Sequence, residues 1–368
     1  MDKLWYKVSN VASIPSPALL VYPERIAENI RRAIQIAGGP ERLRPHIKTH
    51  KCSEVLRLHL ATGIKKFKCA TIAEAEMAAR AAAPDVLIAA QLAGPNLKRL
   101  EALRRAFPRT VFATIADNGQ TIRDLSKTPD TLDHPLPVYL DINCGMDRTG
   151  IYSTQDAFNL YALISRLPGL IPAGLHVYDG HIHDADLGLR ESRCEEAFAP
   201  VEKLRSVLEG NGLSVPTMVA GGTPTFPIHA RHPHRESSPG TYVFWDFGYQ
   251  QFADLDFQPA AVLLTRVISK PTPNRLCLDL GHKAVASENP HPRVQFLGFT
   301  DAAAVTHSEE HLVIATAQAP QWQVGDVLYG IPRHICPTVA LHDFAHPVTN
   351  GIAGAPWKIE ARQRQITI

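Results

Sequence analysis

The chain has 368 residues and a formal net charge of +2 at pH 7, and 45% of its residues are hydrophobic while 20% are charged. This composition is typical of a globular protein, and the small net charge gives no reason to expect nucleic acid or an anionic membrane surface as a partner. The six cysteines lack paired spacing, which argues against a disulfide framework, and no run approaches the ~18 apolar residues of a membrane span. We therefore expect a cytoplasmic protein.

Short apolar runs alternate with longer amphipathic stretches from residue 40 to about 250. The predicted strands are Leu43–Lys48, Lys66–Ala70, Val86–Ala90, Thr110–Ile115, Val138–Ile142, Ala173–Tyr178, Thr217–Ala220 and Tyr242–Asp246. Helical patterns lie between most of them, at 72–83, 95–107, 156–165 and 190–209, but 226–239 is a loop rich in Pro and His. Eight strand–helix alternations predict an α/β fold with a closed eight-stranded parallel barrel of the TIM type.

The rhythm changes after about residue 252. Short predicted strands at 260–268, 275–280, 294–299, 311–316, 327–329 and 338–341 are separated by Pro and Gly, and no long helix is evident. This pattern predicts a smaller C-terminal antiparallel β domain. A further strand at 17–22 is expected to join it, because the barrel already has its eight. The expected organisation is a barrel over 23–251 and a β domain over 252–368, joined by the N-terminal segment 1–22.

Lys48 lies at the end of the first predicted strand, within Arg44-Pro45-His46-Ile47-Lys48-Thr49-His50-Lys51. The carboxyl ends of barrel strands carry the chemistry, and a lysine that is desolvated there can lose its proton and act as a nucleophile. The natural partner is an aldehyde, and pyridoxal phosphate is the commonest aldehyde cofactor. A solvated basic cluster is the alternative, because five of these eight side chains are cationic or titratable.

Two other predicted strands end in residues suited to a planar cofactor. Arg148 follows the fifth strand in a Gly-flanked loop, and Tyr178 ends the sixth. An arginine there can hydrogen-bond a cofactor ring from a fixed position, and a tyrosine can pack flat on it. A surface charge and a core tyrosine are the alternatives.

Two glycine-rich turns predict a phosphate site. Gly221-Gly222-Thr223 follows the seventh strand, and Pro239-Gly240-Thr241 precedes the eighth. Glycine lets the backbone approach a phosphate, whose oxygens exposed amides and the Thr223 hydroxyl can bind. Turns on strands seven and eight match the usual phosphate corner of barrel enzymes.

The β domain contains a possible metal-ligand pair, His334-Ile335-Cys336. On a strand, residues i and i+2 point the same way, so His334 and Cys336 can bind one ion. Imidazole with thiolate favours Zn²⁺, and manganese is the other possibility. Two protein ligands leave open positions for a substrate. Taken alone, a His-x-Cys sequence is more often coincidence.

These residues together resemble the D-threonine aldolase and D-serine dehydratase family, within the alanine-racemase-type (fold type III) pyridoxal-phosphate enzymes. The resemblance covers nearly the whole chain and also includes Asp279-Leu280-Gly281-His282-Lys283 and Leu341-His342-Asp343. It implies that Lys48 attaches the cofactor, that Arg148 contacts its ring and that Tyr178 stacks on or near it. It also implies that Gly222, Thr223, Gly240 and Thr241 hold the phosphate and that His334 and Cys336 bind the metal.

The chain departs from the family pattern at two positions. Aldolases of the family often carry Asp at the second metal position, whereas dehydratases resemble Cys336 more closely. The aldolase pattern also places a histidine, the proposed proton acceptor, six residues after the tyrosine. Here that position is Asp184, with His181 and His183 just before it, so either histidine is a candidate catalytic base.

The resemblance implies a metal-dependent lyase acting on small D-3-hydroxy amino acids. Retro-aldol cleavage to glycine and an aldehyde is the leading expectation, and dehydration of D-serine or D-3-hydroxyaspartate to a 2-oxo acid and ammonia is the alternative. An amino-acid racemase would need a second base, for which 279–283 offers no clear candidate. A non-catalytic pyridoxal-phosphate-binding protein is typically a barrel alone. The fold family also implies a homodimer.

Overall fold

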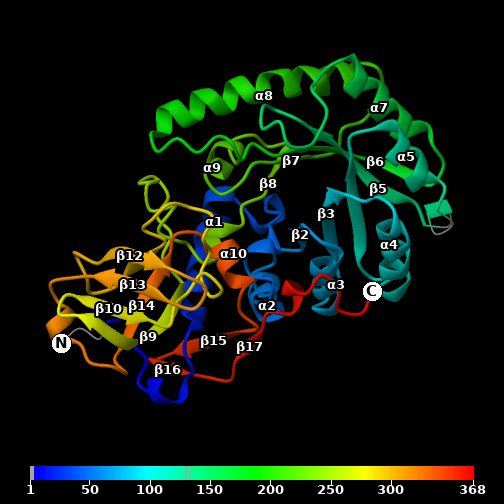
Figure 1. Ribbon diagram of the computed structural model, residues 1–368. Coiled ribbons are helices and arrows are strands. Elements are labelled where there is room, and N and C mark those ends of the chain that lie inside the picture. Colours follow the sequence, from blue (N-terminus) through cyan, green and yellow to red (C-terminus); the bar gives the residue numbers. More distant parts are fainter. Residues whose placement is uncertain (1–3, 129–130, 133) are drawn as a thin grey trace. The chain divides into compact units, whose positions relative to one another are not determined.

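The computed structural model describes residues 4–128, 131–132 and 134–368. These form two compact units (Figure 1). We call Arg31–Lys48, Leu56–Gly240 and Gln363–Ile368 the barrel unit, and we call residues 4–30, Thr49–Val55 and Thr241–Arg362 the β unit. The first three residues of the predicted N-terminal segment lie outside the described residues.

The barrel unit is built on a seven-stranded parallel sheet whose strands follow one another in chain order. Its strands are β2 (Lys66–Cys69), β3 (Asp85–Gln91), β4 (Val111–Ala116), β5 (Leu136–Ile142), β6 (Leu170–Val177), β7 (Met218–Ala220) and β8 (Arg235–Ser237). The helices that connect them are α3 (Ile72–Arg80), α4 (Pro95–Ala106), α5 (Gly119–Ser126), α7 (Gln155–Arg166), α8 (Leu187–Gly210) and α9 (Phe226–His229). This order of parallel strands and helices confirms the predicted α/β class, but the described residues form seven regular strands rather than the eight expected of a closed barrel.

The predicted first strand, Leu43–Lys48, is not a regular strand. Residues 43–46 form only isolated parallel bridges, from Leu43 to Ser237 of β8 and from His46 to Lys68 of β2, and Ile47–Thr49 is a 3-10 turn. Pro45 explains the interruption, because it has no amide hydrogen to donate to a ladder. Thus the sheet has seven regular strands, and one irregular segment hydrogen-bonds to both of its edge strands.

Arg44 ties this closing segment, residues 43–46, to the sheet. Its guanidinium pairs with Glu236 of β8 at 2.8 Å and with both carboxylate oxygens of Asp85 in β3, at 2.6 and 3.0 Å. Arg44 is 1% exposed. The two carboxylates raise the pKa of Arg44 although burial opposes this, so its charge is held inside the unit. A bidentate pair of this kind fixes position as well as charge.

The predicted eighth strand was wrong. Residues 241–243 form a 3-10 helix, and the eighth-position strand is instead β8, inside the stretch that the sequence predicted to be a loop. Its three residues pair in parallel with β7 from Met218↔Arg235 to Ala220↔Ser237. A three-residue strand between Pro- and His-rich stretches offers too few apolar positions for periodicity to reveal it.

The β unit contains a mostly antiparallel sheet, ordered β12-β13-β10-β9-β1-β15-β16 with β11, β14 and β17 paired off this path. Its strands are β1 (Ala18–Val21), β9 (Ala261–Thr272), β10 (Arg275–Leu278), β11 (Val294–Phe296), β12 (Ala303–His307), β13 (Leu312–Ala315), β14 (Val327–Pro332), β15 (Phe344–Thr349), β16 (Ile352–Ala353) and β17 (Trp357–Lys358). As expected, the N-terminal strand joins this sheet: β1 pairs antiparallel with β9 and parallel with β15.

One predicted strand of the β unit is a helix. Residues 338–341 were expected to be extended, but α10 (Ile335–Val339) covers the first two of them. The Thr338 hydroxyl donates to the His334 carbonyl oxygen (2.8 Å), and buried Asp246 accepts the Ile335 amide (2.9 Å). These bonds give partners to the Ile335 amide and the His334 carbonyl at the start of the helix, where backbone amides have no partner within the helix. The remaining helices are α1 (Pro23–Ala37) and α2 (Ser53–Ala61).

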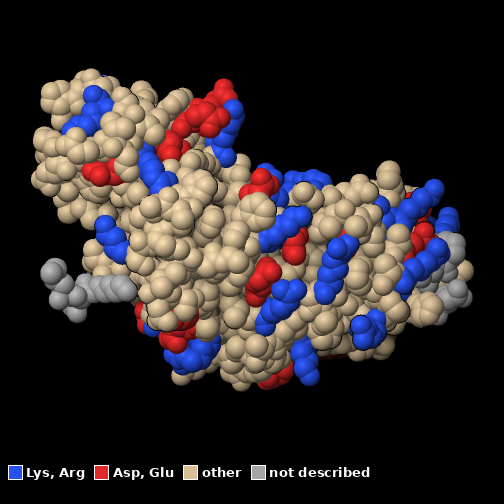
Figure 2. All heavy atoms as spheres, turned by 90° about the horizontal axis from the view of Figure 1, so that it is seen from below, with Lys and Arg blue, Asp and Glu red and all other residues tan. Residues whose placement is uncertain are grey.

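Charged side chains are mixed on the face drawn in Figure 2, where basic and acidic groups are interspersed. Among the described helices, none combines the length and apolarity needed to cross a bilayer.

Candidate functional site

Three cationic side chains of the barrel unit converge on one tyrosine ring. Arg148 Cζ lies 5.0 Å from the centroid of the Tyr178 ring, Lys68 Nζ 5.6 Å and Lys48 Nζ 5.7 Å. Tyr178 directly follows β6, and Lys68 is the penultimate residue of β2. The structure thus brings the predicted residues Lys48, Arg148 and Tyr178 together. A cluster of cations beside an aromatic ring suits an anionic, planar ligand.

The position of Lys48 follows from the closing segment. The His46 amide donates to the Pro239 carbonyl oxygen at 2.8 Å, and the Lys68 amide donates to the Pro45 carbonyl oxygen at 2.9 Å. The chain then turns, with the Lys48 amide donating to His46 Nδ1 at 3.3 Å. Because the 3-10 turn begins at Ile47, Lys48 leaves the line of the sheet at its carboxyl edge, where a barrel holds its ligand.

A buried carboxylate–imidazole pair lies beside these cations. Asp141 Oδ1 is 2.7 Å from His176 Nδ1, and both side chains are nearly inaccessible to solvent. Burial lowers the pKa of His176 despite the neighbouring carboxylate. The hydrogen bond from His176 lowers the pKa of Asp141 although burial opposes it. Both directions fit a neutral imidazole that donates Nδ1–H to a charged carboxylate.

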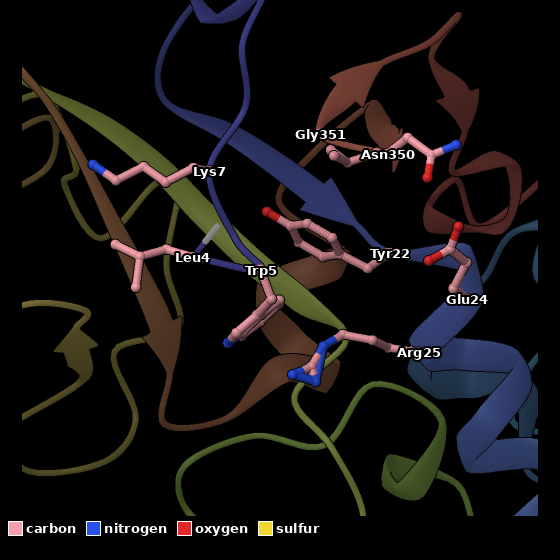
Figure 3. A pocket seen from close by; sticks show the side chains of 9 residues that line it. Leu4, Trp5, Lys7, Tyr22, Glu24, Arg25, Asn350 and Gly351 are labelled. Atoms are coloured by element: carbon pink, nitrogen blue, oxygen red, sulfur yellow. The ribbon is translucent and has the colours of Figure 1, made fainter. Parts of the chain in front are cut away.

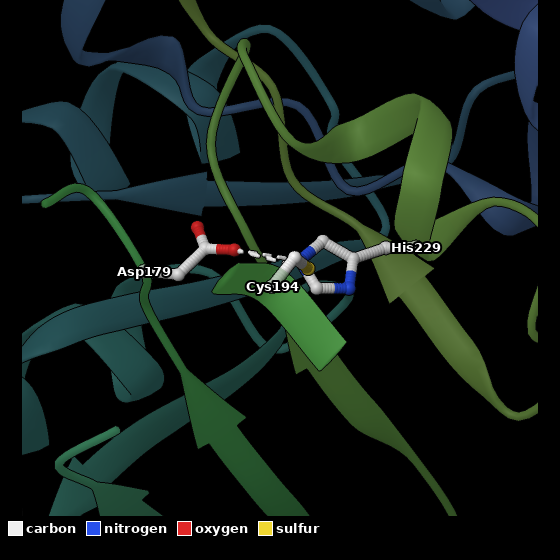
Figure 4. A group of neighbouring side chains, drawn as sticks. All are labelled: Asp179, Cys194 and His229. Atoms are coloured by element: carbon white, nitrogen blue, oxygen red, sulfur yellow. Dashed lines mark hydrogen bonds and ion pairs between the residues drawn. The ribbon is translucent and has the colours of Figure 1, made fainter. Parts of the chain in front are cut away.

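Asp179, Cys194 and His229 form a second buried group (Figure 4). His229 Nε2 lies 2.8 Å from Asp179 Oδ2, the Thr225 hydroxyl donates to Asp179 Oδ1 (2.9 Å), and Arg235 donates to His229 Nδ1 (3.1 Å). Burial, reinforced by Asp179, raises the pKa of the Cys194 thiol. Although three ligand atoms lie close enough for a metal, the arginine and the protonated thiol disfavour one. The group instead anchors the loop directly after Tyr178.

The two glycine-rich turns meet, as predicted for a phosphate site. The Gly240 amide donates to the Thr223 hydroxyl at 3.0 Å. Gly221 has a φ of +73°, and a Cβ added there would lie 2.4 Å from His229 Cδ2. A Cβ on Gly222 would come within 3.3 Å of the Tyr178 ring. One turn follows the carboxyl end of β7 and the other that of β8. Because Gly221 and Gly222 have no side chains, the backbone beside Tyr178 is open to a ligand.

The two candidate proton acceptors differ in environment. His181 Nδ1 is shielded from solvent and has no hydrogen-bond partner among the described residues, while a Cβ on Gly145 would lie 3.1 Å from its Nε2. His183 is exposed. Asp184, at the position where the aldolase pattern has a histidine, is paired with Arg193 at 2.9 Å. The geometry therefore favours His181 over His183.

The predicted metal pair lies in the β unit, but not on a strand. His334 is the extended residue before α10, and Cys336 is in its first turn. The interaction with Cys336 and the hydrogen bond to Glu288 raise the pKa of His334 to about 9, although burial opposes this. Glu288 Oε1 holds His334 Nδ1 at 2.5 Å, which leaves Nε2 for a metal. A carboxylate behind a metal-binding histidine is common in proteins.

Two threonines accompany the Cys336 thiol. Thr49 Oγ1 lies 3.2 Å and Thr241 Oγ1 3.5 Å from Cys336 Sγ. Thr241 was expected to bind phosphate, and in the β unit it contacts Cys336. Imidazole, thiol and nearby hydroxyls are a donor set that fits Zn²⁺, with Mn²⁺ less favoured by the sulfur ligand.

A surface pocket of the β unit is a poor alternative site. It is lined by Leu4, Trp5, Lys7, Tyr22, Glu24, Arg25, Val348, Asn350 and Gly351 (Figure 3). Arg25 Cζ lies 3.7 Å from the Trp5 ring centroid and Tyr22 packs edge-on against the same ring at 5.0 Å. These contacts hold residues 4–7 in place, and the lining has no buried acid–base pair.

Sequence reasoning missed Lys68, His176 and Glu288. The rule that identified Lys48 at a strand end does not reach Lys68, because Lys68 lies in the middle of the predicted strand Lys66–Ala70. In the sequence, His176 is a single polar residue within an apolar strand. Such a histidine is usually a buried core residue whose hydrogen bonds are satisfied, and not a functional one. Glu288 is 46 residues from His334 and carries no local signal.

Comparison with known proteins agrees with this geometry. Residues 21–246 match the family model for the alanine racemase N-terminal domain, and residues 260–348 match that for a putative serine dehydratase domain. A D-threonine aldolase from Arthrobacter sp is 28% identical over 362 residues, which cover 96% of this chain and 94% of that protein. A 3-hydroxy-D-aspartate aldolase from Paracoccus denitrificans (strain Pd 1222) is 27% identical over 365 residues, covering 95% and 93%.

Among solved structures, D-threonine aldolase from Filomicrobium marinum superimposes with a TM-score of 0.89 at 26% identity, covering 96% of this chain and 97% of that one. The family-model match spans more than half of the chain and contains Lys48, Arg148 and Tyr178. The chain therefore belongs to the alanine-racemase-type family of pyridoxal-phosphate enzymes, in the group that includes the D-threonine aldolases and D-serine dehydratases.

Proposed function

We propose that this protein is a lyase of D-3-hydroxy amino acids that uses pyridoxal phosphate and a divalent metal ion, and that it cleaves its substrate to glycine and an aldehyde. The observation that carries the proposal is the convergence of Lys48 and Arg148 on the Tyr178 ring, at 5.7 and 5.0 Å. A primary amine, a fixed guanidinium and an aromatic face are what an aldehyde-bearing anionic ring requires.

The chain offers residues for each part of the cofactor. Lys48 would attach it covalently, Arg148 would hydrogen-bond its ring, and Tyr178 would pack against it. Gly222, Thr223 and Gly240 would bind the phosphate in the barrel unit, with Thr241 next in the chain. When bound, pyridoxal phosphate supplies an electron sink for the electron pair left at the substrate Cα.

The metal would be held by His334 and Cys336, with Glu288 orienting the imidazole. A divalent ion there would supply Lewis-acid stabilisation to the β-oxygen of the substrate. Zinc fits the sulfur ligand best, and manganese is the alternative.

Proton transfer separates the two candidate reactions. In aldol cleavage, a base removes the β-hydroxyl proton while the Cα–Cβ bond breaks, and His181 is the better placed of the two histidines because its Nδ1 is shielded and unpartnered among the described residues. In dehydration, Lys48 would remove the Cα proton and the β-hydroxyl would leave. Cys336 favours this second reaction, because family dehydratases carry cysteine there. The aldolase relatives favour the first.

The test measures cofactor attachment and products. Purified protein is mixed with pyridoxal phosphate and its absorption spectrum is recorded for the wild type, Lys48→Ala and the exposed-surface control Lys65→Ala. D-threonine, D-serine and D-3-hydroxyaspartate are then supplied with Zn²⁺ or Mn²⁺. Glycine plus an aldehyde supports the aldolase, and a 2-oxo acid plus ammonia supports the dehydratase. Failure of the wild type to attach the cofactor would refute the whole proposal.

A homodimer is part of the same proposal, since the family fold implies one. Sedimentation velocity of the active protein should give a dimer, and a stable, active monomer would contradict it. A racemase would instead interconvert D- and L-amino acids, and a non-catalytic cofactor carrier would bind pyridoxal phosphate without forming any product.

A further inference from the structure

Lys68 places a second amine in the group around Tyr178. Its side chain is 1% exposed, and its backbone forms a parallel bridge with His46 of the closing segment. Lys48 is two residues beyond His46. The two Nζ atoms lie at nearly equal distances from the Tyr178 ring centroid, 5.6 Å for Lys68 and 5.7 Å for Lys48.

The surroundings of Lys68 do not neutralise a charge on it. The charged or titratable groups that face it are Lys48, Arg44, Asp141, His176, Tyr178 and Asp179. The two carboxylates already have close partners, because Asp141 binds His176 at 2.7 Å and Asp179 binds His229 at 2.8 Å. An ammonium group at Lys68 would therefore be buried without a carboxylate of its own, which is costly.

Burial, followed by the charge on Lys48, lowers the pKa of Lys68 to about 7, although Asp179 and Asp141 oppose the shift. A lysine in this range is uncharged in a large fraction of molecules at neutral pH and can accept a proton.

We propose that Lys68 is the proton acceptor for Lys48 during covalent attachment of the cofactor. The Lys48 ammonium gives one proton to Lys68 Nζ, and the freed electron pair on Lys48 Nζ forms a bond to the aldehyde carbon. Both protons that remain on Lys48 Nζ then move to the aldehyde oxygen, which leaves as water. The nitrogen and carbon end joined by a double bond, and Lys68 ends as an ammonium. The inference rests on the proposed function, because it needs an aldehyde cofactor.

The experiment measures the rate at which cofactor-free protein attaches pyridoxal phosphate, from about pH 6 to about pH 9. Attachment is followed by absorbance and by the mass of the Lys48 peptide after borohydride reduction. The variants are Lys68→Met, which keeps the volume, and Lys68→Arg, which keeps a charge but cannot accept a proton. Lys66→Met is the matched control, because Lys66 lies two residues earlier on the same strand and pairs with Glu236.

At pH 7 we expect both Lys68 variants to attach the cofactor at least about 100-fold more slowly than the wild type, with the deficit shrinking as the pH rises. Lys66→Met should behave like the wild type. A third variant, Lys68→Ala, leaves room for an added base. Imidazole, which accepts protons but forms no such bond with an aldehyde, should restore part of its rate. The wild-type rate itself should rise through an inflection near pH 7.

Several results would overturn the inference. Lys68→Met at the wild-type rate and pH profile would do so, and so would a fully active Lys68→Arg, which would assign the effect to charge alone. If the Lys68 variants fail to fold, a wild-type profile without an inflection near neutral pH overturns it independently. If the wild type attaches no cofactor, both this inference and the proposed function fail. If the wild type attaches the cofactor and the Lys68 variants attach it equally fast, only this inference fails.

Discussion

Asp141 and His176 occupy directly opposed positions on the neighbouring parallel strands β5 and β6, and their side chains meet at 2.7 Å. Because the two strands are paired in this register, both residues lie at the same level of the sheet, and their side chains are adjacent. His176 Nε2 has no hydrogen-bond partner among the described residues. The pair is thus a buried polar contact whose protonation is coupled to the folded state.

This coupling predicts loss of stability in acid. The folded pKa of His176 lies below its unfolded value of about 6.5, so unfolding takes up a proton as the pH falls. The stabilising contribution is present above about pH 6.5 and is lost below it, by at most about 1.4 kcal/mol per pH unit for one group. His176→Gln, measured by denaturant unfolding between about pH 4 and pH 7.5, should flatten this slope. His311→Gln, at an exposed position, should leave it unchanged; equal slopes in all three proteins would contradict the assignment.

Removing Arg44 should destabilise the barrel unit strongly. Arg44→Met would leave Glu236, which is 7% exposed, with only Lys66 as a cationic partner. Breaking a buried pair of this kind typically costs about 3–5 kcal/mol. Urea unfolding provides the measurement, and Lys65→Met, on the surface nearby, should change stability by no more than about 0.5 kcal/mol. A loss below 1 kcal/mol, roughly the value of an exposed pair, would show that Arg44 is not needed to hold the closing segment.

Substitution of the two histidines after Tyr178 should have different effects on the rate of substrate cleavage. His181→Asn should reduce the rate of substrate cleavage by about 100-fold or more, because its imidazole is shielded and available as a base. His183→Asn should have little effect, because that side chain is exposed. Initial rates of aldehyde formation from D-threonine give the comparison, with cofactor attachment checked by absorbance in both variants. The reverse order of effects would move the base to His183.

Glu288 should tune metal affinity without binding the metal. Glu288→Gln removes the carboxylate that holds His334 Nδ1, and loss of such a partner typically weakens metal binding by about 10–100-fold. Equilibrium dialysis with Zn²⁺ measures this directly. Glu309→Gln, whose carboxylate pairs with Lys283, is the control. Cys336→Ser should weaken binding more than either, and an unchanged affinity in that variant would exclude Cys336 as a ligand.

The sequence predicts the βα order and most residues that the structure groups in the candidate site, because both depend on local patterns. Alternating apolar runs identify β2 to β7 within a few residues, and the strand-end rule finds Lys48 and Tyr178. The errors occur where tertiary contacts override local preference. Pro45 breaks what periodicity predicts as a strand, and Asp246 supplies a helix-start contact from 89 residues away. No window of sequence contains that information.

Contacts between residues that are apart in the sequence also limited the prediction of the site. Lys68 gains its importance from burial and from Lys48, and neither is visible in Lys66-Phe67-Lys68-Cys69. The position of Gly240 beside Thr223 was predicted correctly, although from the wrong strand, because the glycine turn follows β8 rather than preceding a later strand.

The closing segment has a consequence for synthesis of the protein. Arg44 and Ser238, which bond across it, are 194 residues apart, so the ribosome must make most of the barrel unit before this contact can form. Until then the closing segment, which bridges β2 on one side, has no partner strand on its other side, and that edge is open to pairing with other chains. A nascent chain stalled before β8 should therefore need chaperone protection. In refolding, the Arg44 amide, which donates to the Ser237 carbonyl oxygen, should be among the last to resist hydrogen exchange.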